Sequence, residues 1–343
     1  MASTKKTLVV LGATGNQGGS VVRTFLSDPS LAAEWHVRGV TRNASSDAAT
    51  KLSGLGAEMV SATLDSVAEL KSAFEGATAI FAVTDFWSAV HSQEVVRRVQ
   101  EEGVGLAIAA QDLEETWGRN LAAAAADIPG LERLVLSTLP PVSELSHGKL
   151  KHVHHFDGKA NMAKHIQKTH PDLWLRTSQI LVGFYTSNIL PGSYFPPTYN
   201  PNTNQAEFDG PASVDTLVPF IDVAYSTGPF VKALVLTEPA GTVLAAYDEM
   251  KSMGDCIEVI KKATGRELIH VQKTIEEIAA ASPLGLEVPE SWLWLAEYGL
   301  LGEKVAEWWK LVKSPADLTE KLEGRSVEGW IKEQDWSKAF EAV

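Results

Sequence analysis

The sequence predicts an α/β protein in which a doubly wound parallel sheet is followed by a smaller, mostly helical C-terminal region. Short apolar segments rich in β-branched residues recur up to residue 138, as expected of buried strands. Helical patterns separate these segments, and this alternation gives repeated βαβ units and therefore a parallel sheet.

The domain boundary follows from a change of composition beyond Ile180. Residues 191–204 are rich in Pro, Asn, Tyr and Gly, which suggests an ordered loop, and helical patterns with several tryptophans follow from Lys251 onward. We therefore assign residues 1–180 to the sheet domain, with further strands from about 215–247, and residues 181–343 to the C-terminal region.

The first predicted strand, Leu8–Leu11, leads directly into the glycine-rich turn GATGNQGG, and a helical pattern begins at Ser20. Gly12 allows a tight turn, Gly15 lets the backbone approach a pyrophosphate, and Gly18 lets the helix pack against the sheet. The free N–H groups of the helix would hold the phosphates. Strand, glycines and helix together predict a dinucleotide-binding fold rather than a purely structural turn.

The second strand, His36–Thr41, ends at Arg42, where such folds contact the adenosine ribose. An acidic residue there would bind the 2′-hydroxyl of NAD, whereas a guanidinium grips a 2′-phosphate in bidentate fashion. Arg42 therefore predicts NADP(H), and Arg38 is the weaker candidate. The alternative is that Arg42 is a solvated surface charge.

After the strand Glu58–Ser61, Thr63 and Asp65 are expected at the adenine edge of the site. Asp65 has a second interpretation as the N-cap of the helix Val67–Phe74. The next strand, Ala79–Val83, places Thr84 at the cofactor crevice.

Aromatic residues follow Thr84, and a long helical region follows them. Phe86 and Trp87 could stack on adenosine, wall the substrate cleft or simply pack. The helical region 92–126 is too long for one crossover, so we expect a break near Gly103 or Gly118. The remaining elements expected are a strand over 134–138, a loop to about residue 154, a helix over 156–168 and a strand over 174–179.

Three residues carry the predicted chemistry. Ser137 lies at the end of a strand, and His155 and Lys159 are four residues apart, hence on one face of a helix. A nicotinamide enzyme that reduces a carbonyl needs a proton donor, a cation near the ribose and a hydroxyl that orients the substrate. Lys159 can be the cation, Ser137 the hydroxyl and His155 the donor, although His155 could also merely pack.

Other classes of site and function are disfavoured. A cluster of histidines (147, 152, 154 and 155) lacks the Cys or carboxylate spacing of a known metal site, so no metal is expected. The net charge of −13 argues against non-specific nucleic-acid binding. No apolar run reaches the roughly 20 residues that span a membrane. A single cysteine and the absence of a signal-like N-terminus favour a cytoplasmic protein.

Four segments give the chain a family resemblance: GATGNQGGSVV, VTRN, VTDFW and HFDGKANM. With the segment Val218–Leu236, they resemble the NmrA-like branch of atypical short-chain dehydrogenases/reductases over about residues 7–280. The resemblance implies a Rossmann core with NADP(H) in a cleft that the C-terminal region covers. The residues expected to bind the cofactor are Gly12, Thr14, Gly15, Asn16, Gln17, Gly18, Arg42, Thr63, Asp65, Thr84 and Lys159.

The chain departs from the family pattern at two places. Short-chain dehydrogenases carry a Tyr four residues before the Lys, and here His155 occupies that position. Relatives often have Gly-Asp after the third strand, where this chain has Ala62-Thr63. Some members of the branch transfer hydride with the Lys as the main catalytic residue, whereas others resemble redox sensors or transcriptional co-regulators.

The sequence therefore leaves two functions open. The first is an NADP(H)-dependent oxidoreductase for a small aromatic or polyketide-type metabolite, with a Lys in place of the Tyr-Lys pair. Five aromatics could wall its substrate pocket, or form core: Phe184, Tyr185, Tyr194, Phe195 and Tyr199. The second is a non-catalytic NADP-binding sensor or transcriptional co-regulator with a protein partner, and only for this function does a nuclear location stay open.

Overall fold

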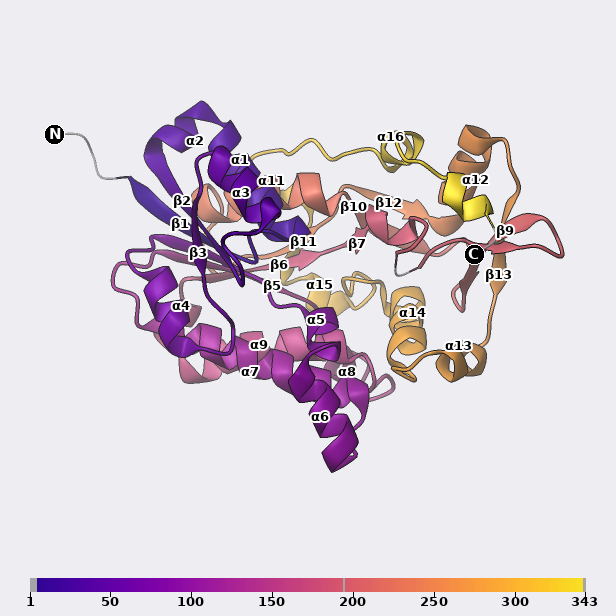
Figure 1. Ribbon diagram of the computed structural model, residues 1–343, viewed down its shortest axis with the longest axis horizontal. Coiled ribbons are helices and arrows are strands. Elements are labelled where there is room, and N and C mark those ends of the chain that lie inside the picture. Colours follow the sequence, from indigo (N-terminus) through magenta and orange to yellow (C-terminus); the bar gives the residue numbers. More distant parts are fainter. Residues whose placement is uncertain (1–4, 194, 342–343) are drawn as a thin grey trace.

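The computed structural model describes residues 5–193 and 195–341. Within these residues, the largest sheet has eight strands, all parallel, in the order β14-β11-β6-β5-β4-β1-β2-β3 (Figure 1). Its strands are β1 (Lys6–Leu11), β2 (Trp35–Thr41), β3 (Glu58–Ser61), β4 (Ala79–Ala82), β5 (Arg133–Thr138), β6 (Thr177–Val182), β11 (Val243–Ala246) and β14 (Val312–Lys313). The strand order reverses between β1 and β4, and ligands of such sheets bind at this switch point.

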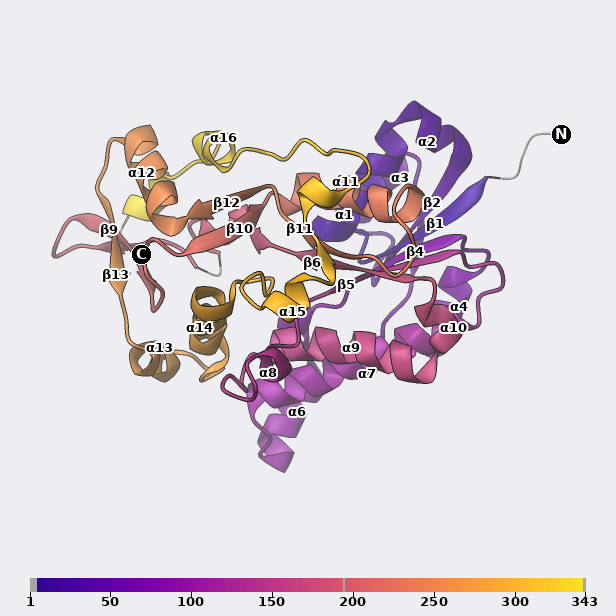
Figure 2. The ribbon, with the colours of Figure 1, turned by 180° about the vertical axis from the view of Figure 1, so that it is seen from behind.

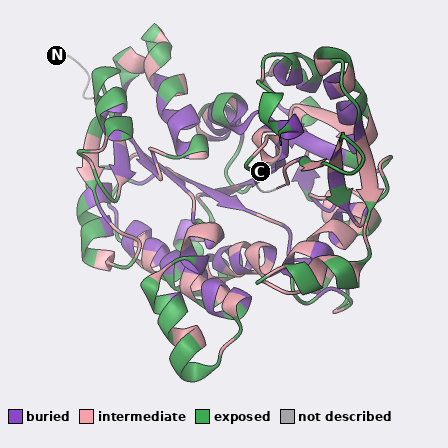
Figure 3. Ribbon diagram, turned by 45° about the vertical axis from the view of Figure 1, so that its right-hand side comes forward, coloured by how far each residue is buried: buried purple, intermediate pink, exposed green. Residues whose placement is uncertain are grey.

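Helices cover both faces of the large sheet, as the alternating side chains of β1 require. Leu8 and Val10 face one core with α1, α2, α3 and α11, whereas Val9 and Leu11 face the other with α4, α7, α9 and α10. The two groups of helices lie on opposite sides of the sheet (Figure 1), whose strands are largely buried between them (Figure 3). These helices are α1 (Asn16–Ser27), α2 (Pro29–Glu34), α3 (Asp47–Gly54), α4 (Val67–Phe74), α7 (Leu106–Ala126), α9 (His154–Thr169), α10 (Pro171–Trp174) and α11 (Val223–Leu236).

The helical region after β4 divides into three helices. They are α5 (Phe86–Val90), α6 (Gln93–Glu102) and α7, and a short helix α8 (Val142–Leu145) precedes α9. The predicted break lies at Gly103, whose φ of 68° is left-handed. Helix α7 continues through Gly118. A glycine is needed there because a Cβ would lie 2.2 Å from Cγ of Met162 on α9, so Gly118 marks close packing of the two helices and not a break.

The C-terminal region combines helices with two small sheets around a third hydrophobic core (Figure 2). The sheets have the orders β12-β10-β7 and β13-β9-β8. Their strands are β7 (Phe184–Tyr185), β8 (Thr198–Asn200), β9 (Gln205–Gly210), β10 (Leu217–Ile221), β12 (Glu249–Ser252) and β13 (Leu268–Gln272). The helices are α12 (Met253–Thr264), α13 (Ile275–Ala281), α14 (Glu287–Tyr298), α15 (Ala306–Trp309) and α16 (Val327–Lys332), with 3-10 turns at Thr186–Ile189, Pro315–Asp317 and Ser337–Phe340.

Several predicted boundaries were wrong. The first helix begins at Asn16 and not at Ser20, because the turn already closes at Gly15, whose carbonyl accepts the first helical hydrogen bond from the Gly19 N–H. Trp174 ends the short helix α10, which Pro171 begins, so the following strand starts three residues later than expected. The 191–204 segment contains β8, and Tyr194 lies outside the described residues. No helix in the described part of the chain is long and apolar enough to cross a membrane.

Candidate functional site

The glycine-rich turn joins β1 to α1 and is shaped by two of its glycines. Gly12 has a φ of 68°, which disfavours other residues. The Gly15 N–H donates a hydrogen bond to the Gly12 carbonyl at 2.9 Å and closes the turn. A Cβ on Gly18 would lie 2.3 Å from the same carbonyl oxygen. Gly18 thus lets α1 approach the turn itself, in addition to the sheet beneath it.

The N-terminus of α1 is open to an anion. Its N-cap, Gly15, supplies no side-chain hydrogen bond, and the first turn contains no acidic residue. The N–H groups of Asn16, Gln17 and Gly18 are therefore the donors that the helix leaves unpaired. The Gln17 amide donates to the Tyr185 hydroxyl at 2.7 Å, and its buried Oε1 has no partner among the described residues. This arrangement fits a pyrophosphate.

Arg42 lies beside this turn, because Thr14 and Thr41 join the turn to the end of β2. Their hydroxyl oxygens are 3.1 Å apart. Arg42 is exposed, and within the described chain it has no ion pair or side-chain hydrogen bond. Arg38 is instead committed to the sheet domain: its guanidinium binds the Glu58 carboxylate at 2.8 Å and two backbone carbonyls. Arg42 is therefore the cation available to a 2′-phosphate.

The end of β3 is held by hydrogen bonds within the protein. The Thr63 N–H donates to Glu69 at 2.9 Å. Trp117 on α7 donates its indole N–H to Asp65 at 2.7 Å. The prediction of Asp65 as the N-cap of α4 is wrong, because the cap is Ser66, whose hydroxyl accepts from the Glu69 N–H.

Lys159 reaches the carboxyl end of β4 and meets Thr84 there. Its ammonium donates to the Thr84 carbonyl at 3.0 Å and to the Thr84 hydroxyl at 3.1 Å. The same ammonium forms an ion pair with Glu114 of α7, and the Thr84 hydroxyl donates to that carboxylate at 2.7 Å. The Glu114 side chain is fully buried, and its Oε2 has no partner among the described residues. We call Lys159, Glu114 and Thr84 the lysine cluster.

Sequence reasoning missed Glu114. Its signal was present, since Glu114 interrupts an otherwise apolar stripe of α7 at helical spacing. The buried members of that stripe are Ala107, Ala110, Trp117 and Leu121. A carboxylate in such a position needs a cationic partner, but the sequence does not show that this partner is Lys159.

His155 lies one turn before Lys159 on α9, and its Nδ1 contacts the buried carboxylate of Glu287 on α14. Three aromatic rings surround its imidazole, with centroids at 5.9 Å (Phe86), 5.4 Å (Trp87) and 4.6 Å (Phe156). Phe86 and Trp87 therefore pack around His155. The remaining predicted residue, Ser137, is buried within β5, and the neighbouring Thr138 hydroxyl donates to the Lys159 carbonyl at 3.0 Å.

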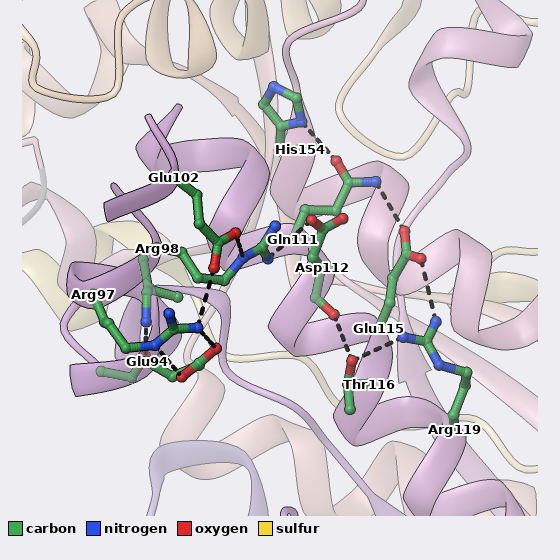
Figure 4. Close-up of polar contacts among 12 residues, drawn as sticks. Glu94, Arg97, Arg98, Glu102, Gln111, Asp112, Glu115, Thr116, Arg119 and His154 are labelled. Carbon is green, nitrogen blue, oxygen red and sulfur yellow. Dashed lines mark hydrogen bonds and ion pairs between the residues drawn. The ribbon is translucent and has the colours of Figure 1, made fainter. Parts of the chain in front are cut away.

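The other histidines of the cluster lie elsewhere. Nδ1 of His154 is 2.6 Å from the side-chain oxygen of Gln111 on α7 (Figure 4). His154, Asp157 and Asn161 line a polar pocket of about 250 Å³ on a different face of α9 from Lys159. Burial lowers the pKa of His154 and raises that of Asp157. In the described part of the chain, no three His, Cys, Asp or Glu side chains are placed to hold a metal ion.

Comparisons with known proteins identify the family of the chain. A model of the NmrA-like family matches residues 4–331. An NmrA-like family domain-containing oxidoreductase of Penicillium ochrochloron is 27% identical over 281 residues, which cover 78% of this chain and 76% of the relative. An NmrA-like family domain-containing protein of Dictyostelium discoideum is 24% identical over 306 residues, covering 86% and 88%.

Solved structures show the same fold. NmrA, a negative transcriptional regulator in complex with NADP, has a TM-score of 0.68 at 20% identity, covering 96% of this chain and 95% of the other. The leucoanthocyanidin reductase of Vitis vinifera, in binary complex with NADPH, has a TM-score of 0.66 at 13% identity, covering 95% and 98%.

Proposed function

Because the chain belongs to the NmrA-like family, we propose that it is an NADP(H)-dependent oxidoreductase that acts on a small aromatic or polyketide-type metabolite. One observation carries the proposal: the open N-terminus of α1 and the lysine cluster lie at the carboxyl ends of β1 and β4. These strands are neighbours at the switch point of the sheet, where a bound dinucleotide would reach both.

The chain's own residues fit the parts of NADP(H) in order along this edge. The first-turn N–H groups of α1 would hold the pyrophosphate, and Arg42 would bind the 2′-phosphate. Thr63 and Asp65 would lie toward the adenine end. Thr84 and Lys159 would approach the ribose next to the nicotinamide. The unpaired Gln17 Oε1 supports a polar ligand at the turn, because buried acceptors normally have a donor.

The bound nicotinamide would supply or accept a hydride, and the protein would position the substrate and handle the proton. His155 is the proton donor in this account, since imidazole exchanges protons near neutral pH. Lys159 would place its ammonium beside the reacting groups, while Glu114 and Thr84 fix the position of that ammonium.

We infer the substrate class from aromatic side chains of the C-terminal region, which pack within and against its hydrophobic core, whereas the relatives support only the reaction class. Trp292 of α14 contacts Phe195 with ring centroids 5.2 Å apart and Phe184 at 6.1 Å. Tyr185, which follows Phe184 in the chain, accepts a hydrogen bond from the Gln17 amide through its hydroxyl. Curated relatives in Penicillium, Cladobotryum and Aspergillus carry the description of oxidoreductase.

The test is NADPH oxidation, followed by absorbance, with a panel of aromatic ketones, enones and quinones. Lys159→Met should abolish turnover and leave NADPH affinity within a few fold. Lys164→Met is the matched control, because Lys164 lies on the same helix, is half exposed and pairs with Glu144 at the surface. Turnover by Lys159→Met at the wild-type rate would contradict the catalytic role of this residue.

A non-catalytic NADP-dependent regulator is the second candidate. Its specific support is that Glu114 already neutralises Lys159, and that His155 stands where dehydrogenases carry Tyr. A regulator requires only that the two redox forms of the cofactor bind differently. No turnover with any panel member, together with a large difference between NADP⁺ and NADPH affinity, would favour this candidate.

A further inference from the structure

We propose that Glu287 is a positioning residue for His155. It holds the imidazole with a proton on Nδ1, so that Nε2 delivers the proton during substrate reduction. The inference rests on the proposed function, and it adds a residue of the C-terminal region to a site otherwise built on the sheet domain.

The contacts of Glu287 favour this role. Its side chain is fully buried and pairs with Nδ1 of His155. One carboxylate oxygen accepts the His154 N–H at 2.7 Å, and the other accepts the His155 N–H at 3.4 Å. These backbone bonds fix the carboxylate at the first turn of α9, where the helix dipole favours a negative charge. The carboxylate is thus anchored independently of the imidazole.

The chemistry of the pair sets the tautomer. An ionised carboxylate accepts hydrogen bonds and donates none, so Nδ1 must carry a proton in the bond to Glu287. The rings of Trp87 and Phe156 restrict rotation of the imidazole. Nε2 is then the nitrogen that can gain and lose a proton. The same logic governs carboxylate-oriented histidines in triads.

The proton transfer balances with NADPH as the reductant. The substrate carbonyl carbon accepts a hydride, and the electron pair of the C=O π bond moves to oxygen. The oxygen takes the Nε2 proton as an alcohol forms, so the imidazolium becomes neutral imidazole. Solvent then returns a proton to Nε2.

Helix α14 provides a matched control, because Glu290 repeats the contacts of Glu287 one turn later. Glu290 accepts the N–H groups of Lys151 and His152, each at 2.8 Å, and contacts Nδ1 of His152 at 2.6 Å. The His152 side chain is 47% exposed, whereas that of His155 is 17% exposed. Glu290 attaches α14 to the segment just before α9, whereas Glu287 attaches it to the first turn of α9 and contacts the imidazole that lies one turn before Lys159.

The first experiment needs no substrate, and its only variant serves to assign signals. Long-range ¹H–¹⁵N correlation spectra of the ¹⁵N-labelled full chain would follow the ring of His155 as pH is raised, with His155→Gln to assign its signals. We expect Nδ1 to stay protonated and only the Nε2 shift to change. A neutral ring with its proton on Nε2 would overturn the proposal, whatever the protein's activity.

The second experiment compares Glu287→Gln with Glu290→Gln, using the fastest substrate of the carbonyl panel. Glu287→Gln should lower kcat at least about tenfold, since general acid catalysis contributes more than that. NADPH affinity should stay within twofold, and Glu290→Gln should keep kcat within twofold. Equal losses of kcat in both variants would mean that Glu287 only attaches α14. If the wild type turns over nothing, the proposed function fails, and the ring spectra alone decide whether Glu287 positions His155.

Discussion

Two groups of oppositely charged side chains lie on neighbouring helices and differ chiefly in their exposure. In the lysine cluster, the Lys159 side chain is 12% exposed and that of Glu114 is fully buried. On α6, Arg97 binds Glu94 and Glu101 at 2.9 Å and Glu102 at 3.1 Å, and the Arg97 side chain is 44% exposed (Figure 4). The Lys159–Glu114 pair is therefore shielded from solvent, whereas the Arg97 pairs are exposed to it.

Burying a charged side chain costs free energy, so a buried ion pair indicates a functional site more strongly than an exposed one does. Each charge of the α6 network is solvated whether or not its partner is present, so the network implies little about function. The lysine cluster removes two charges from water at the carboxyl edge of the sheet, which is expensive unless each compensates the other. Glu114 also keeps an oxygen without a partner among the described residues. Such an arrangement is expected of a site rather than of a core.

The largest effect should come from breaking the buried pair. Glu114→Ala leaves the Lys159 ammonium without its counter-charge and should lower the free energy of unfolding by about 3–5 kcal/mol. Chemical denaturation measures the change. Adding Lys159→Met to Glu114→Ala removes the unpaired charge and should recover part of the loss. A double variant less stable than Glu114→Ala would contradict the interpretation that burial of an uncompensated charge is the cost.

A smaller effect should come from His154 of α9, which contacts Gln111 of α7 (Figure 4). Burial lowers the pKa of His154 below its ordinary value of 6.5. The unfolded chain therefore binds this proton more readily, so stability should fall as pH drops below about 6.5. His154→Gln should reduce this slope in denaturation midpoints measured across that range. The exposed His91→Gln is the control, and an equal slope change there would refute the assignment.

The smallest effect should come from Arg97→Ala on α6. Hydrogen bonds to Glu94 and Glu101 raise the pKa of Arg97, which therefore stays charged in every usable buffer. Because solvent screens its ion pairs, we expect no measurable change in the denaturation midpoint, in low salt or in high salt. A loss comparable to that of Glu114→Ala would erase the contrast between the two groups.

The sequence predicted the parts of the site that local pattern specifies. The glycine turn, Arg42 and the His155/Lys159 spacing each lie within one segment, where the strand-turn-helix pattern indicates their position. Glu114 and Glu287 escaped prediction because they meet their partners only through the tertiary fold, at separations of 45 and 132 residues.

The fold shows the same division. Strands within the βαβ repeats were predicted, with errors of a few residues at their ends. The edge strand β14 has only two residues, Val312 and Lys313, and is formed by pairing with β11. Two residues are too few to show the alternation of apolar and polar side chains that predicts a strand, so the sequence did not indicate β14.

The most direct test of the account is calorimetric binding of NADP⁺, NADPH, NAD⁺ and NADH to the wild type and to Arg42→Ala. We expect NADP⁺ and NADPH to bind at least about tenfold more tightly than NAD⁺ and NADH, a difference of about 1.4 kcal/mol in binding free energy. Arg42→Ala should remove this preference. Lys51→Ala, which changes an exposed cation on α3, is the control and should keep the preference. Failure of the wild type to bind any of the four dinucleotides would contradict the central claim that the α1 turn and the lysine cluster form one cofactor site.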